Sequence, residues 1–194
     1  MNYPLRLNFK ILGLAPQIFL RDAAGEDVFY VKQKLFKLKE AVQVFKDKSR
    51  ADLRYTIGAD RILDFSAKYQ IADASGEALG AVKRQGMRSI FRATYEVFDE
   101  DGAQVLLISE ESVMKRMLDR LAGEVPLLGF VLVMLINPTY LVKRGDEVVM
   151  KLVKKPAFFE GKFEVEQVVP LSEREEKRAV LSLLMMSLLE RSRG

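Results

Sequence analysis

Basic side chains gather in two stretches of the sequence, and concentrated positive charge attracts anions. Residues 29–55 hold eight Lys or Arg residues against three acidic ones, and residues 79–98 hold four against Glu96 alone. Lysine offers a point charge, and arginine offers bidentate contacts to phosphate or carboxylate groups. We therefore predict an anion-binding site on these stretches. Its candidate ligand-binding residues are Lys32, Lys34, Lys37, Lys39, Lys83, Arg84, Arg88 and Arg92.

Two other interpretations of the basic stretches remain open. Lysines also keep solvent-facing strands from aggregating, so the stretches can be solvated surfaces without a ligand. Basic residues interleaved with Phe36 and Phe91 could instead follow a nucleic-acid backbone and stack its bases. However, the alternation of apolar residues directs both rings toward a core, and no known nucleic-acid-binding motif is present.

Residue types that carry catalysis are scarce. The chain has no histidine and no cysteine, so it lacks the usual general base, the thiol nucleophile, disulfides and zinc-thiolate sites. The candidate acids or bases are Asp60, Asp64 and Glu160, and the candidate nucleophiles are Ser66 and Ser109. No spacing links any of them to an activating partner. We therefore predict a protein that is not an enzyme and that has no metal site and no cofactor.

The most apolar stretch lies near the carboxyl terminus. Residues 179–189 read AVLSLLMMSLL, with nine apolar side chains in eleven positions, so a helix here is apolar on every face. Such a helix must be enclosed. The run is shorter than the roughly 18 residues that span a bilayer, so the protein itself is the expected container. Ser172 and Glu175 fit a capping box, which places the predicted helix at about 172–191.

Repeated hairpin signals predict that this container is built from strands. The sequence Asp-Ala-Ala-Gly-Glu at 22–26 recurs as Asp-Ala-Ser-Gly-Glu at 73–77, and a degenerate third copy covers 140–148. Each copy has an apolar strand, a polar turn with glycine and a second strand. Residues 91–97 and 159–166 then alternate between apolar and polar side chains, which is typical of half-buried antiparallel strands. Together with the tail, the pattern predicts a sheet closed around a helix.

Residues 111–136 depart from this alternation. The first part, 111–122, has apolar residues at helical spacing, and the apolar run 125–138 is interrupted by Gly129. We expect an accessory helical insertion at about 111–136 in a single domain that covers 1–194. A buried strand or short helix is favoured over membrane insertion for the apolar run. The amino terminus lacks the residue order of a secretory signal, so a cytoplasmic location is expected.

Several segments together resemble the LURP-one-related proteins. They are residues 29–45, 55–84, 156–168 and the tail 181–194. This family belongs to a superfamily that includes the phospholipid scramblases and the tubby carboxy-terminal domain. The resemblance implies a mainly β fold, namely a closed antiparallel β-barrel of about twelve strands around a hydrophobic C-terminal α-helix.

The resemblance also implies a function at membranes. Tubby domains bind phosphoinositide head groups through basic residues on the barrel exterior, and scramblases act on membranes. The tubby basic motif does not align with specific positions of this chain, so no residue is assigned from it. Scramblases are associated with calcium, but residues 99–102 lack the ligand spacing of a calcium loop and are expected to form a plain turn.

The expected function is a non-catalytic binding or scaffold module for anionic phospholipid head groups, phosphoinositides included, or for a membrane surface. Its contact with the membrane would be peripheral, without a transmembrane span. The alternatives are a nucleic-acid-binding protein and a purely structural or protein-interaction domain.

Overall fold

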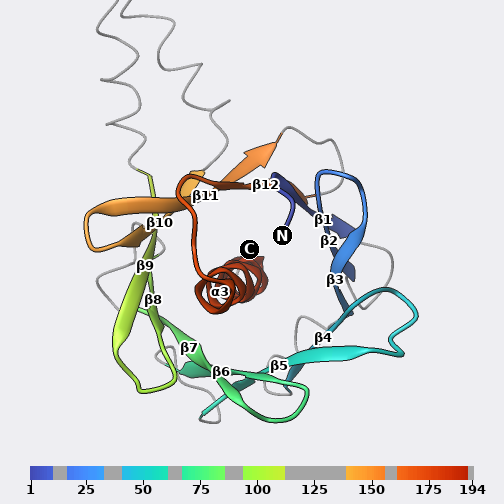
Figure 1. Cartoon of the computed structure of the whole chain (residues 1–194), viewed down its shortest axis with the longest axis horizontal. Coiled ribbons are helices and arrows are strands. Elements are labelled where there is room, and N and C mark those ends of the chain that lie inside the picture. The colour runs from blue at the N-terminus through green and yellow to red at the C-terminus, as the bar shows by residue number, and fades with distance from the viewer. Residues whose placement is uncertain are drawn as a thin grey trace, which may run out of the picture.

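Alternating apolar residues build twelve antiparallel strands that close into a barrel (Figure 1). The computed structural model describes residues 1–10, 17–32, 41–60, 67–85, 94–111, 139–155 and 161–191. The strands are β1 (Leu5–Lys10), β2 (Gln17–Arg21), β3 (Asp27–Lys32), β4 (Val42–Phe45), β5 (Leu53–Ala59), β6 (Lys68–Asp73), β7 (Ala78–Arg84), β8 (Thr94–Phe98), β9 (Gln104–Glu110), β10 (Thr139–Arg144), β11 (Glu147–Lys155) and β12 (Gly161–Gln167). The predicted accessory insertion at 111–136 lies, apart from Glu111, outside the described residues.

Each strand pairs with its neighbours in sequence, and β1 pairs with β12 to close the ring. Because every pairing is antiparallel, the odd-numbered strands all point the same way and the even-numbered strands point back. Short turns after β2, β4, β6, β8 and β10 therefore lie at one end of the barrel, which we call the turn end. The odd-numbered strands finish at the opposite end, which we call the exit end.

The helix α3 (Glu173–Arg191) runs through the barrel from the turn end to the exit end (Figure 1). The predicted capping box forms at its start: the Ser172 hydroxyl accepts a hydrogen bond from the Glu175 amide, and the Glu175 carboxylate accepts one from the Ser172 amide. Every residue from Arg178 to Leu189 is buried. Their enclosure on all sides confirms the prediction that the protein's own strands surround the apolar tail.

The inner face of the barrel wall supplies the other half of the core. Along β1, Leu5, Leu7 and Phe9 are buried while the residues between them are more exposed. The predicted alternation at 91–97 and 159–166 holds where those ranges are described, since Tyr95, Val97 and Val165 are buried. The buried face of the strands and the fully buried helix thus form one core.

The predicted hairpin turns form as expected, and the structure adds another copy. Gly25 and Gly76 have φ angles of 88° and 91°, which is the left-handed region that favours glycine. Asp73 holds its turn by accepting the backbone N–H of Glu77 on its carboxylate. The acidic turn at 99–103 repeats this arrangement, because Asp99 accepts the N–H of Ala103 and Gly102 has φ 86°. The Asp99 carboxylate therefore has the turn role that the sequence predicts.

Candidate functional site

The described members of the predicted binding set lie toward one end of the barrel. Lys32 is the last residue of β3, and Lys83 and Arg84 are the last two residues of β7. Since β3 and β7 point the same way, all three residues are at the exit end. Lys34, Lys37, Lys39, Arg88 and Arg92 lie outside the described residues.

The two basic stretches do not adjoin within the wall. A single site on both stretches would need the two hairpins to lie side by side, but three strands, β4 to β6, separate β3 from β7. At about 4.8 Å per strand step, four steps place them roughly 19 Å apart along the wall. The strand-borne cations Lys32 and Lys83 therefore face separate parts of a surface and do not form one compact cradle.

The structure also divides the first basic stretch between the two ends. Lys32 is at the exit end, whereas Lys46, Lys48 and Arg50 lie between β4 and β5, at the turn end. A window of sequence cannot show this separation, because it appears only when the strand directions are known.

Arg84 faces the interior of the barrel. Its Nε lies 3.3 Å from the Glu190 carboxylate near the end of α3, and its side chain is only 18% exposed. The Tyr95 hydroxyl donates a hydrogen bond of 2.5 Å to the same carboxylate. Burial, together with Glu190, raises the pKa of Tyr95 well above its usual range, so the phenol remains a donor. Arg84 thus serves to anchor the helix to the wall.

Lys83 lies on the outer surface. Its register partners are Lys68 on β6 and Glu96 on β8. The Lys68 ammonium lies 3.9 Å from the centre of the Phe98 ring, a cation–π contact. Lys83 is therefore a surface cation with another cation next to it.

The residues considered for catalysis do not come together. The carboxylate of Asp60 accepts the backbone N–H of Lys68 across the β5–β6 connection. Ser109 is on β9, three strands away from the β5–β6 pair that carries Asp60. Asp64, Ser66 and Glu160 lie outside the described residues.

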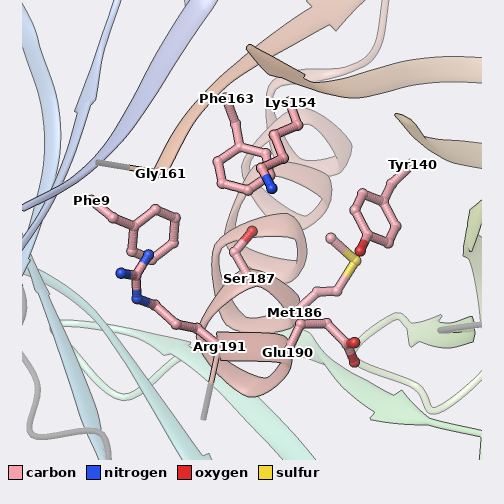
Figure 2. Close-up of a pocket in the computed structure, with 9 residues that line it drawn as sticks. All are labelled: Phe9, Tyr140, Lys154, Gly161, Phe163, Met186, Ser187, Glu190 and Arg191. Atoms are coloured by element: carbon pink, nitrogen blue, oxygen red, sulfur yellow. The ribbon is translucent and has the colours of Figure 1, made fainter. Parts of the chain in front are cut away.

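A cavity of about 350 Å³, which no sequence pattern indicated, opens at the exit end between α3 and the wall (Figure 2). Strands β1, β10, β11 and β12 contribute one side, and the last two turns of α3 contribute the other. The lining residues are Phe9, Tyr140, Lys154, Gly161, Phe163, Met186, Ser187, Glu190 and Arg191. Burial raises the pKa of Tyr140 to about 12, and so its phenol is protonated at neutral pH.

Charge is distributed unequally between the two barrel ends, counting only the described residues. The exit end comprises the three strand residues nearest to it, the flanking residues Asp60 and Glu111, and the last turn of α3. It carries nine cations, namely Lys10, Lys32, Lys68, Lys83, Arg84, Lys154, Lys155, Lys162 and Arg191. Its five carboxylates are those of Asp60, Glu96, Glu110, Glu111 and Glu190. The turn end is counted in the same way, from its turns, the three strand residues nearest to it and the first turn of α3, with Glu96 kept at the exit end. It carries sixteen carboxylates, namely Asp22, Glu26, Asp27, Asp47, Asp52, Asp73, Glu77, Asp99, Glu100, Asp101, Asp146, Glu147, Glu166, Glu173, Glu175 and Glu176. Its nine basic side chains are Arg6, Arg21, Lys46, Lys48, Arg50, Arg54, Lys143, Arg144 and Arg174.

A family model described as LURP-one-related matches residues 27–166. The chain belongs to the LURP-one-related family. The closed barrel with its internal helix is the architecture that the sequence resemblance implied, and it is consistent with the tubby-like and scramblase-like superfamily. No curated protein and no solved structure matches the chain. Within the described part of this LURP-one-related protein, no helix has the length and apolarity needed to cross a bilayer.

Proposed function

We propose that this LURP-one-related protein is a non-catalytic binding module whose exit end docks onto anionic phospholipid head groups at a membrane surface. The observation that carries the proposal is the charge difference between the barrel ends, with cations in excess at the exit end and carboxylates in excess at the turns. An anionic surface attracts one end and repels the other, so the barrel would meet the membrane in one orientation.

Family membership is compatible with this proposal. Barrels of this family and its tubby-like relatives are generally non-enzymatic. The broad distribution of the cations also favours a surface over a small ligand as the partner, because Lys32 and Lys83 are separated by three strands. A membrane presents many head groups, and each could meet a different cation.

The expected binding is weak and depends on salt. Each Lys or Arg close to an anionic leaflet contributes about 1 kcal/mol, and this attraction falls off within a Debye length. Four such residues would bring the protein to an anionic vesicle at low ionic strength, and a high salt concentration would release it.

Vesicle co-sedimentation with two matched charge-reversal variants tests the proposal. One variant changes Lys32, Lys34, Lys37 and Lys39 to Glu; the control changes Lys46, Lys48, Arg50 and Arg54, which lie at the turn end, to Glu. The vesicles contain phosphatidylcholine alone, or with phosphatidylserine or a phosphoinositide. We expect the first variant to lose about 4 kcal/mol of binding, close to a thousandfold, and the control to bind like the wild type. Equal loss in both variants, or no binding by the wild type, would contradict the proposal.

A titration with labelled DNA at two salt concentrations distinguishes membrane docking from the main alternative, nucleic-acid binding. Nucleic-acid binding would give an affinity that falls steeply and linearly in log–log form with salt. Under the membrane proposal, DNA binds no better than other polyanions and vesicles bind in preference. A domain with a purely structural or protein-interaction role would bind neither.

A further inference from the structure

The cavity at the exit end shares Lys154 and Arg191 with the exit-end cations, but the ligand that it fits differs from a membrane surface. It lies inside the barrel, beside the last two turns of α3 (Figure 2). Its volume of about 350 Å³ is at the lower end of the range for small-molecule sites, which is roughly 300–1,000 Å³. A site of this size suits one small molecule.

One part of the cavity is apolar and aromatic. The rings of Phe9 and Phe163 meet edge to face, with centroids 5.8 Å apart and planes at 72°. Met186 adds a flexible thioether from α3, and Tyr140 adds a ring on the side opposite Phe9 (Figure 2). This lining favours an apolar body in the ligand.

The polar part of the cavity carries two cations, Arg191 and Lys154, that pair with no carboxylate of the described residues. The Arg191 guanidinium lies 5.0 Å from the centre of the Phe9 ring, and no carboxylate among the described residues forms an ion pair with it. Lys154, beside Phe163 in the β11–β12 register, likewise has no ion pair within the described chain. Among the described lining residues the one carboxylate is that of Glu190, which is held by Arg84 and Tyr95.

Burial lowers the pKa of Arg191, which indicates that desolvation of its charge is not offset by a nearby anion. A partly buried cation without a counter-charge is costly, and a bound anion would relieve that cost.

Gly161 leaves the space that the Arg191 guanidinium occupies. A Cβ atom at this position would lie 3.0 Å from the Arg191 Nη1 atom and 3.4 Å from the rings of both Phe9 and Phe163. The absence of a side chain therefore lets Arg191 and the two rings meet at the same wall of the cavity.

We infer that this cavity binds a single-chain amphipathic anion, namely a medium-chain fatty carboxylate. The carboxylate would accept hydrogen bonds from Arg191 and Lys154, and the chain would lie against Phe9, Phe163 and Met186. At roughly 30 Å³ per water-sized group, the volume holds about a dozen non-hydrogen atoms, which is the size of decanoate. This inference is independent of the proposed membrane docking, because it concerns one water-soluble molecule inside the barrel.

Isothermal titration calorimetry with decanoate, below the concentration at which it forms micelles, tests the inference. We expect saturable binding of one decanoate per chain. Decanol and decyltrimethylammonium, which have the same chain but a neutral and a cationic head, should bind at least tenfold more weakly. Equal binding of the cationic compound, or no saturable binding of decanoate, would overturn the inference.

Two variants and a control locate the site. Arg191→Gln should weaken decanoate binding at least tenfold while leaving the melting temperature of the free protein unchanged or higher, because it removes an unpaired charge. Arg191→Lys should retain part of the affinity. Lys162→Gln, an exposed exit-end cation that does not line the cavity, is the control. If Arg191→Gln binds decanoate as tightly as the Lys162→Gln control, the assignment of the cavity is wrong.

These measurements separate the cavity from the membrane proposal. The charge-reversal variant at Lys32, Lys34, Lys37 and Lys39 should lose vesicle binding and keep decanoate binding. Arg191→Gln removes one of the nine exit-end cations, so it should lose decanoate binding and weaken vesicle binding by no more than about fivefold. Loss of both activities in the same variant would contradict the independence of the two sites.

Discussion

Arg178 joins the start of α3 to the barrel wall at the turn end. Its guanidinium is almost fully buried, and it donates a 2.7 Å hydrogen bond to the Leu79 carbonyl and pairs with Glu100. It can reach the wall because Gly80 has no side chain. The φ angle of Gly80 is 139°, and a Cβ there would lie 2.2 Å from the Phe98 carbonyl oxygen and 2.9 Å from the Arg178 Nε atom. Glycines in turns can be predicted from the local sequence. The need for Gly80 cannot, because it comes from contact with Arg178, about 100 positions further along the chain.

Gly80→Ala should therefore be more destabilising than an alanine at a turn glycine. The positive φ costs about 1 kcal/mol or more, and the backbone clash adds about 1–3 kcal/mol. Gly25→Ala is the matched control, because Gly25 has φ 88° but a Cβ atom there would have nothing within 4 Å. Urea denaturation should give a loss of about 2–5 kcal/mol for Gly80→Ala and about 1 kcal/mol for Gly25→Ala. Similar losses would show that the contact with Phe98 and Arg178 does not exist.

Ser182 is a polar residue whose replacement should stabilise the protein. Its side chain is fully buried in α3, and its hydroxyl has no hydrogen-bond partner among the described residues. Ser187, one and a half turns later, donates to the Leu183 carbonyl at 2.8 Å. Ser182→Ala should raise the free energy of unfolding by about 1 kcal/mol, because it removes an unsatisfied polar group. Ser187→Ala should change it little or lower it. A loss of stability in Ser182→Ala would contradict this account of the helix interior.

Carboxylates at the turn end make the stability of the fold depend on pH. The hydroxyl and amide of Ser172 hold the pKa of Glu175 below its usual value of 4.5, and hydrogen bonds from Ser75 do the same for the pKa of Asp73. A folded-state pKa below the unfolded one gives stability that is complete above the unfolded value and is lost as pH falls through the folded value. The melting temperature should thus fall as pH drops below about 4.5, and Glu175→Gln should reduce that fall. A melting temperature that rises as the pH falls below 4.5 would contradict the stabilising role of these carboxylates.

At the scale of elements, the sequence was most informative where a pattern is local. The apolar tail, its capping box at Ser172 and the alternation around Tyr95 all depend on residues within a few turns or strand steps, and all three were predicted correctly. The turn at 99–103 shows the limit. It shares the Asp and Gly positions of the turns at 22–26 and 73–77, but the flanking sequence differs, and only the hydrogen bonds of Asp99 show that it is the same turn.

Replacement of a central α3 side chain tests the packing of this element. Leu184 is 1% exposed and faces the barrel wall, so Leu184→Ala should lower the free energy of unfolding by about 2–5 kcal/mol. Leu184→Lys should prevent soluble expression, since a buried unpaired charge costs several kcal/mol. Lys177→Ala, which removes a surface ion pair with Glu173 and a contact with Tyr55, should cost about 1 kcal/mol. A soluble Leu184→Lys variant that melts cooperatively would refute the enclosed helix.

At the scale of the whole molecule, function depends on strand direction. Basic residues were visible in the sequence, but their placement at one end follows from twelve alternating strands, and the same topology sends Lys46 and Lys48 to the other end. The cavity at the exit end was unpredictable for a related reason. Phe9, Tyr140 and Arg191 come from three distant parts of the sequence and meet only because β1 pairs with β12 and α3 ends between them.

Barrel closure also predicts which fragment will fail to fold. The family match covers 27–166, but β1 and β2 complete the wall before it and α3 fills the core after it. A fragment of residues 27–166 should be insoluble or lack a cooperative melting transition, because its inner face has lost the helix and its strand edges are open. The chain from 1 to 191 is the control and should melt cooperatively. A fragment that melts like the control would mean that the closed wall and the helix are not needed.

Hydrogen exchange of the α3 amides tests most directly whether the helix lies inside a closed wall. Residues 180–188 are buried by strands on every side, so their amides can reach solvent only when the barrel opens. We expect these amides to exchange with a free energy equal to that of global unfolding measured by urea denaturation, and to match the slowest amides of β11. Exchange of residues 180–188 at the rate of the exposed turn at 99–103 would show that the helix is not enclosed.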